Sequence, residues 1–354
     1  MIKYLGSKRA LLDQITCLMS LFPELSSIAD LFSGTSRCGH AFKRLGKQVF
    51  SNDHNTYAYT LAQCYVAADR EQVEKDARRL IDEFNRLSGY SGYFTETFCR
   101  EARFFQPFNG ERVDAIRNEL DRRSLSPELR AVLLTSLMEA ADRVDSTCGI
   151  QMAYVKQWAK RSFKPLKLRM PDVLPSVSAG PCYASQMEAI EAARRITSDI
   201  AYLDPPYNQH SYLSNYHIWE TLIRWDQPEA YGVARKRVDC RERKSPFNTK
   251  RGCHKALSDV IREVQAKLLV VSFNNEGFID RPTMEALLST RGEVLVWEHA
   301  FRRYIGAQIG IHNPKGERVG EVSHIKNKEY LYVVLTEELL HMIPDAKQRL
   351  ESLI

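Results

Sequence analysis

Residues 27–53 read SIADLFSGTSRCGHAFKRLGKQVFSND, and this stretch decides the fold class. Its apolar start, Ser27–Phe32, predicts a buried strand that ends at a Ser-Gly turn. Helical periodicity follows over Cys38–Leu45, and a second predicted strand, Gln48–Ser51, ends at an Asn-Asp pair. A strand, a tight turn, a helix and a second strand are the usual opening of a parallel α/β sheet. We therefore expect an α/β fold.

The same alternation returns in the second half of the chain. Further strands are predicted at Gly180–Ala184, Asp199–Leu203, Lys267–Phe273, Glu293–His299 and Tyr330–Leu335. A long loop separates the last two, which we expect to form an antiparallel pair that closes the sheet. In between, long charged helical patterns such as Glu71–Leu87 and Pro127–Val144 replace the strand signals. Residues 1–65 and 176–354 are thus predicted to form one domain, interrupted by a mostly helical insertion over 66–175.

The composition excludes several classes of protein. The chain has 354 residues, 44% of them hydrophobic, and its charges are mixed in sign, so a full core is expected and disorder is not. Its eight cysteines are scattered without a CxxC pair, which argues against a zinc site and a disulfide framework. The charged start and the lack of an apolar run of about 18 residues predict no signal peptide and no membrane span. We expect a cytoplasmic protein.

The strongest chemical motif is Asp204-Pro205-Pro206-Tyr207, which directly follows the apolar run Ile200–Leu203. Ligands of α/β sheets bind at the carboxyl ends of the strands, where this motif is predicted to lie. The two prolines stiffen the loop and leave their carbonyl groups as acceptors. The Asp204 carboxylate and the Pro205 carbonyl can accept two amino protons, and Tyr207 can stack on a flat ring. The motif therefore suits a planar base that carries an amino group.

The turn after the first strand, Asp30–Thr35, contains Gly34 but lacks the GxGxxG spacing that cradles a pyrophosphate. Asp53 ends the second strand, and an acid at that place typically accepts hydrogen bonds from ribose hydroxyls. S-adenosylmethionine has a ribose and no phosphate, so it fits both observations. The missing phosphate loop disfavours a nicotinamide dehydrogenase, and a solvent-facing turn acid remains the alternative for Asp53.

Taken in this order, the motifs resemble those of the Dam-like (alpha-group) DNA adenine methyltransferases, many of which serve restriction–modification systems. The resemblance extends to Lys3–Lys8 (KYLGSK), Ser211–Thr221 (SYLSNYHIWET), Val271–Gly277 (VSFNNEG) and Asn327–Leu331 (NKEYL). It implies a Rossmann-like class I S-adenosylmethionine-dependent methyltransferase fold. It also implies methyl transfer to the exocyclic N6 amino group of an adenine flipped out of duplex DNA.

The resemblance also gives individual residues expected roles. Residues expected to bind S-adenosylmethionine are Tyr4, Lys8, Asp30, Phe32, Gly34, Asp53 and Asp204. Residues expected to hold the flipped adenine during catalysis are Asp204, Pro205, Pro206 and Tyr207. Lys8 would reach the cofactor carboxylate or the DNA. Residues 1–65 and 176–354 would be the catalytic domain and 66–175 the target-recognition domain. The implied partners are double-stranded DNA and a companion restriction endonuclease, and no metal is expected.

Two positions depart from the family pattern. Ser36 stands where the family usually has a second glycine in the first turn, which could alter the fit of the cofactor. The family often places an acid near the adenine of the cofactor, and Ser185 and Gln186 occupy that region here. The residue that contacts the cofactor adenine is therefore left open.

Positive charge is concentrated in residues 234–251 (ARKRVDCRERKSPFNTKR), which we call the basic segment. It holds eight basic and two acidic residues, and this excess of six equals the net charge of +6 for the whole chain. We expect Arg235, Lys236 and Arg237 to contact DNA phosphates. The alternative is a solvated charged loop.

Aromatic and basic residues also interleave over Tyr90–Phe108, within the insertion. Arg100 and Arg103 are expected to contact base edges of the DNA, since arginine is the residue most often used to read them. The phenylalanines of this stretch, Phe94, Phe104 and Phe105, either contact DNA or form the core of the insertion. Both alternatives stay open.

Three further hypotheses bear on function. A methyltransferase for RNA or for a protein amide would share the fold, but the large insertion and the acid at position 204 argue against it. A non-enzymatic DNA-binding regulator with a decayed cofactor site is disfavoured because Asp53 and the Asp204–Tyr207 motif are intact. His217 and Glu220 are three residues apart without a third ligand nearby, so a pair on a helix surface is expected rather than a metal site.

Overall fold

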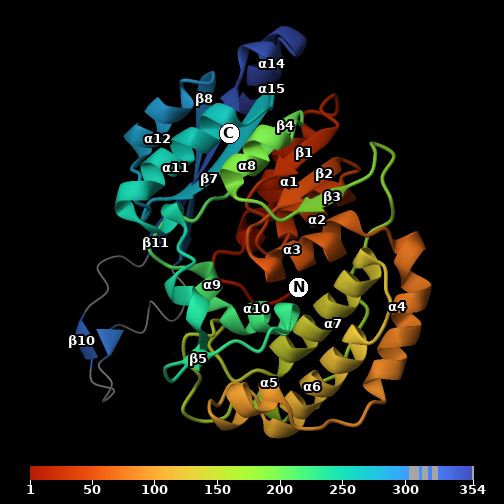
Figure 1. Ribbon diagram of the computed structural model, residues 1–354. Coiled ribbons are helices and arrows are strands. Elements are labelled where there is room, and N and C mark those ends of the chain that lie inside the picture. Colours follow the sequence, from red (N-terminus) through yellow and green to blue (C-terminus); the bar gives the residue numbers. More distant parts are fainter. Residues whose placement is uncertain (303–310, 313–317, 321–325, 353–354) are drawn as a thin grey trace.

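The computed structural model describes residues 1–302, 311–312, 318–320 and 326–352. Its centre is a seven-stranded sheet in the order β3-β2-β1-β4-β7-β11-β8 (Figure 1). The strands are β1 (Ser27–Asp30), β2 (Gln48–Asn52), β3 (Tyr183–Ser185), β4 (Ile200–Leu203), β7 (Leu268–Asn274), β8 (Glu293–Arg302) and β11 (Lys326–Leu335). Neighbours are parallel except at β11, which is antiparallel to both β7 and β8. The predicted antiparallel pair is confirmed.

Helices cover both faces of this sheet because successive strand residues point to opposite sides. In β1, Ile28 and Ala29 belong to two different hydrophobic cores. The first core is formed with α1 (Leu12–Ser20), α2 (Arg37–Arg44), α14 (Glu337–Met342) and α15 (Ala346–Glu351). The second is formed with α8 (Ala189–Arg195), α11 (Lys250–Glu263) and α12 (Arg281–Leu288). The predicted Rossmann-like α/β fold is confirmed.

The predicted insertion is helical, as expected. It contains α4 (Arg70–Asn85), α5 (Tyr93–Thr95), α6 (Pro107–Asp121) and α7 (Pro127–Val144), which lie below the sheet in Figure 1. The bounds of α7 agree with the prediction because local signals fix its start. Pro127 occupies the first turn, and the Ser126 hydroxyl accepts a hydrogen bond from the Leu129 N–H.

A third hydrophobic core joins the insertion to the rest of the chain. It combines α4, α6 and α7 with α3 (Thr56–Ala62) and α10 (His217–Arg224). Phe94, Phe104 and Phe105 lie in it, with at most 1% of each residue exposed. Their alternative role as DNA contacts is therefore set aside, and the division into two domains stays a prediction.

The remaining strands and α-helices of the described residues are short. They are α9 (Tyr212–Asn215), the hairpin of β5 (Ala230–Tyr231) with β6 (Lys236–Arg237), and the pair of β9 (Ile311–His312) with β10 (Arg318–Gly320). Where placement is described, no helix is both long and apolar enough to cross a membrane.

Candidate active site

The predicted site residues meet where β1, β2 and β4 end. Parallel strands bring their carboxyl ends to one edge of a sheet, so the loops after these strands become neighbours. One pocket at this edge is lined by all seven residues expected at the cofactor, from Tyr4 to Asp204, and by Pro206. Pro205 and Tyr207 are not among its lining residues; Tyr207 packs edge-on against Phe273, with ring centroids 6.0 Å apart.

The turn after β1 has an unusual backbone. Gly34 has a φ of 50° and Ser36 a φ of 58°, both in the left-handed region that favours glycine. Ser36 is fully buried, and its hydroxyl has no hydrogen-bond partner among the residues described. Ser36 stands where the family usually has a glycine, and its backbone conformation is one in which glycine would relieve strain.

Asp30 is a buried acid without a side-chain partner. It is 1% exposed, and within the described parts of the chain no side chain pairs with its carboxylate. Burial raises the pKa of Asp30 to about 8, and the negative charges of Asp204 and Asp53 add to this, whereas the nearby backbone N–H groups of Gly39 and Phe32 oppose it. An unpaired buried acid that lines a pocket is suited to a ligand with a cationic group.

Asp53 ties the first two loops together. Its Oδ2 accepts a hydrogen bond of 3.0 Å from the Gly34 N–H, and its Oδ1 accepts one of 2.9 Å from the Asn55 N–H. Burial raises the pKa of Asp53 above its usual range. A carboxylate has about four acceptor positions, so lone pairs remain for a ligand hydroxyl.

Lys8 does not point towards a free ligand position but pairs with two acids. Its Nζ lies 3.0 Å from Asp204 Oδ1 and donates to Glu329 Oε1. Glu329 is held in turn by the Ser272 hydroxyl at 2.9 Å and the Asn274 amide at 3.2 Å. Sequence reasoning assigned no role to Glu329, because this contact depends on β11 lying beside β7.

The three charges influence one another. Burial raises the pKa of Asp204 to about 6, Lys8 opposes that rise, and Glu329 adds to it. Burial alone would lower the pKa of Lys8, but the two carboxylates raise it well above its usual value. The pKa of Glu329 is lowered, because Lys8 and its hydrogen bonds outweigh the effect of burial. Lys8 and Glu329 thus hold Asp204 in place at the pocket.

Tyr4 brings the N-terminal segment to the pocket. Its ring stacks on Tyr212 and Tyr216, with centroids 5.1 and 4.5 Å away, and its hydroxyl lies 3.1 Å from that of Tyr57. A side chain added at Gly34 would lie 3.5 Å from the Tyr4 ring. Tyr4 therefore closes the pocket over the first turn, as expected for a residue bordering the cofactor.

The loop after β3 contributes residues that sequence reasoning missed. Ser185 donates to Asn52 Oδ1 at 2.9 Å, and Gln186 donates to Thr56 Oγ1 at 3.1 Å, so both stabilise loops. Met187 and Glu188 line the pocket in their place. Glu188, two residues beyond Gln186, is thus the acid of this loop that lines the pocket.

The residues predicted to contact DNA differ in their exposure and in their partners. Arg100 is exposed and paired with Glu96, and the Arg103 guanidinium lies 4.9 Å from the ring centroid of Trp158. Arg235 pairs with Glu101 at 2.5 Å, and Lys236 is partly exposed on β6.

The prediction that Arg237 contacts DNA phosphates is wrong. It is 2% exposed and donates to Asp226 at 2.8 and 2.7 Å and to Asp239 at 2.9 and 3.2 Å. These bonds use every nitrogen of its guanidinium, which is thereby withdrawn from solvent. Arg237 is a structural residue of the basic segment and not an available phosphate ligand.

The sequence analysis did not identify a second basic stretch. Residues 146–171 contain no acid, and their basic residues are Lys156, Lys160, Arg161, Lys164, Lys167 and Arg169. Phe163 and Met152 are exposed beside them, at 60% and 38%. The signal that could have identified this stretch was the absence of acids over its whole length.

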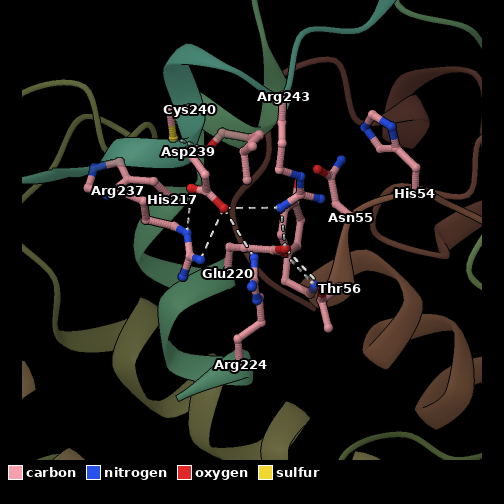
Figure 2. A network of polar contacts seen from close by, with 12 residues as sticks. His54, Asn55, Thr56, His217, Glu220, Arg224, Arg237, Asp239, Cys240 and Arg243 are labelled. Atoms are coloured by element: carbon pink, nitrogen blue, oxygen red, sulfur yellow. Dashed lines mark hydrogen bonds and ion pairs between the residues drawn. The ribbon is translucent and has the colours of Figure 1, made fainter. Parts of the chain in front are cut away.

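The prediction of a helix-surface pair at His217 and Glu220 is wrong, since both residues are completely buried. His217 Nε2 lies 2.9 Å from the Gln151 carbonyl, within the insertion. Glu220 accepts hydrogen bonds from Thr56 Oγ1 and the Tyr57 N–H and pairs with Arg243 (Figure 2). Among the residues with described placement, no group of three or more potential metal ligands occurs.

Several known proteins are similar to this chain. The family model of the D12 class N6 adenine-specific DNA methyltransferases matches residues 4–274. The chain is 30% identical over 328 residues to the type II methyltransferase M.FokI of Planomicrobium okeanokoites, covering 86% of this chain and 50% of that protein. It is 26% identical over 347 residues to the type II methyltransferase M.NlaIII of Neisseria lactamica, covering 93% and 100%. It is 27% identical over 322 residues to the modification methylase StsI of Streptococcus sanguinis, covering 86% and 49%. The chain thus spans about half the length of M.FokI and StsI.

Proposed function

The chain belongs to the D12 class N6 adenine-specific DNA methyltransferases, and from this premise we propose that it methylates the N6 amino group of an adenine flipped out of duplex DNA. Proteins of this family use S-adenosylmethionine as methyl donor. The observation that carries the proposal is the pocket that joins the unpaired Asp30, the loop acid Asp53 and the Asp204 motif.

The residues of the pocket fit S-adenosylmethionine. Asp30 supplies an unpaired carboxylate for the cationic methionine end, and Gly34 lets the backbone approach it. Asp53 accepts hydrogen bonds from the ribose hydroxyls. Tyr4 and Phe32 supply apolar walls. The cofactor contributes an electrophilic methyl group on its sulfonium.

The Asp204 motif receives the flipped adenine. Asp204 and the Pro205 carbonyl accept the amino protons, and Tyr207 stacks on the ring, which offsets the few kcal/mol that flipping costs. Lys8 and Glu329 keep the carboxylate oriented. As the carbon–nitrogen bond forms, the bond between the methyl carbon and the sulfur would break, with S-adenosylhomocysteine as leaving group. The methylated nitrogen would then lose one proton to solvent or to Asp204.

DNA binding is divided between two kinds of surface. Arg100 and Arg103 in the insertion contact base edges, and the insertion acts as the target-recognition domain. Arg235, Lys236 and the basic stretch 156–169 contact phosphates. The names of the relatives, type II methyltransferase and modification methylase, support a role in a restriction–modification system. A companion endonuclease and a cytoplasmic location are part of the same proposal.

Labelled methyl transfer measured on three substrates tests this function. Duplex DNA containing adenine should become labelled, whereas structured RNA and a mixture of soluble proteins should not. Labelling confined to RNA or to protein would refute the proposal, as would transfer to a duplex whose adenines were all replaced by an analogue without the amino group.

A further inference from the structure

Arg243 belongs to the basic segment, yet it lines the cofactor pocket. Figure 2 shows its side chain reaching between Glu220 and the loop that carries His54 and Asn55. This loop follows Asp53 directly. Arg243 therefore stands apart from the other charges of its segment, because it faces the pocket for a small molecule.

Glu220 fixes the position of this arginine. The carboxylate is completely buried and accepts hydrogen bonds from Thr56 Oγ1 at 2.9 Å and the Tyr57 N–H at 3.1 Å. Arg243 Nη1 donates to the same carboxylate at 3.1 Å. Since Thr56 and Tyr57 begin α3, Glu220 joins the start of this helix to the arginine.

Part of the Arg243 guanidinium remains free for a ligand. Nη1 is used by Glu220 and lies 3.6 Å from Asp239 Oδ2, whereas Nε and Nη2 donate to no group in the described chain. The side chain is 34% exposed, so these donors are not sealed in the core. An arginine that is held at one nitrogen and keeps free N–H donors at the others can bind a hydrogen-bond acceptor without moving.

We propose that Arg243 binds the nucleoside part of S-adenosylmethionine and that Glu220 is its positioning residue. This inference rests on the proposed function, because it takes S-adenosylmethionine as the ligand of the pocket. The nucleoside part is indicated by the position of Arg243, which lines the pocket beside the loop of His54 and Asn55 (Figure 2). This loop follows Asp53, the acid expected at the ribose. Phe247, four residues on, lines the same pocket and packs edge-on against Phe32, with centroids 5.2 Å apart.

Long-range repulsion and a direct contact predict opposite effects of removing Arg243 on the affinity for S-adenosylmethionine, so a titration can distinguish them. S-adenosylmethionine carries a net positive charge, so removing a nearby arginine would strengthen its binding if the arginine acted only at long range. Weaker binding would therefore report a direct contact. S-adenosylhomocysteine lacks the sulfonium charge, and a direct contact to the nucleoside should contribute equally to the binding of both ligands.

The test is calorimetric titration of both ligands into the full chain and its variants. Arg243→Met should weaken each ligand about ten-fold, the loss expected for a charged hydrogen bond at a partly exposed site. Lys244→Met removes the same charge from the exposed neighbouring residue and should change affinity less than two-fold. Unchanged binding by Arg243→Met would overturn the proposal, whereas a wild-type chain that bound neither ligand would instead refute the proposed function.

A thermodynamic cycle tests the role of Glu220. Glu220→Gln should weaken binding about as much as Arg243→Met, and the double variant should lose no more than either alone. The KM for S-adenosylmethionine should rise while kcat at saturation stays within about two-fold. Full additivity would show that the two residues act separately. If Glu220→Gln did not fold, the titrations of Arg243→Met and Lys244→Met would still test whether Arg243 binds the ligand.

DNA phosphate is the rival ligand for Arg243, and the same variants distinguish it. A phosphate contact would leave the affinity for S-adenosylmethionine unchanged. It would also reduce the salt dependence of DNA binding by about 0.9 in slope. That result would contradict the proposal.

Discussion

The turn after β1 and the basic segment both bury an ionisable side chain, but they differ in what surrounds it. Asp30 has no side-chain partner among the described residues, whereas Arg237 donates to both Asp226 and Asp239. A buried charge that keeps its partners is tolerated by the fold, and one without partners costs free energy unless a ligand pairs with it. Burial alone therefore does not identify a functional residue.

The largest expected effect concerns Asp204, whose charge is paired but still faces the pocket. Asp204→Ala removes an acceptor for the amino protons, so kcat should fall by about 10²–10³-fold. DNA affinity should change far less, because the substitution leaves the phosphate contacts intact. Single-turnover methylation and a DNA-binding titration would measure the two effects. Near wild-type turnover would remove Asp204 from the mechanism.

The pH dependence sharpens this prediction. Because the pKa of Asp204 is raised to about 6, its acceptor form is lost as pH falls through that value, and the rate should fall with it. Lys8→Met removes the charge that opposes the rise, so the acidic limb of the pH–rate profile should move to higher pH. An acidic limb that did not move in this variant would contradict the assignment.

Arg237 is expected to affect stability rather than binding. Arg237→Met leaves Asp226 and Asp239 partly buried without their partner, which should reduce the free energy of unfolding by about 3 kcal/mol. Arg235→Met is the matched control, since Arg235 pairs with the half-exposed Glu101 and should cost less than about 1 kcal/mol. Urea unfolding measures both. Equal losses would show that burial adds nothing to the contribution of the Arg237 ion pairs.

Asp30 should behave in the opposite way. Its pKa is raised to about 8 in the fold, so charging it opposes folding and stability falls as pH rises between the unfolded pKa and that value. Asp30→Asn should therefore stabilise the fold by about 1–2 kcal/mol near pH 7. The gain should disappear below about pH 4, where the acid is protonated in the unfolded chain as well as in the fold. The variant should also lose S-adenosylmethionine binding, and tight binding would contradict a role for Asp30.

The smallest expected effect lies in the same turn. Ser36→Gly allows the φ of 58° without strain, so the fold should gain about 0.5–1 kcal/mol. Thermal unfolding would show a midpoint a few degrees higher. Ser33→Gly is the control, because Ser33 has no positive φ, and it should be neutral or destabilising. A destabilising Ser36→Gly would mean that the serine side chain itself is needed.

Local signals explain what could be predicted from the sequence. The apolar run before Asp204 and the turn at Gly34 each depend on neighbouring residues, and both were located correctly. All seven residues expected at the cofactor line one pocket because parallel strands end at one edge of the sheet.

Contacts between distant segments explain what could not be predicted. Glu329 reaches Lys8 only because β11 inserts between β7 and β8. Glu220 is buried because α10 packs against α3 as well as the insertion, so its spacing from His217 carried no information about its surroundings. Arg237 looked like an exposed charge because one of its partners, Asp226, is 11 residues away in the sequence and is brought to it only by the fold.

The central claim is that this pocket directs a methyl group to the N6 atom of adenine in DNA. The most direct measurement is nucleoside analysis by mass spectrometry of a duplex incubated with the protein and S-adenosylmethionine. We predict N6-methyladenine with the wild-type protein and a large loss of it with Asp204→Ala. A methylated cytosine, or equal N6-methyladenine in both samples, would contradict this account.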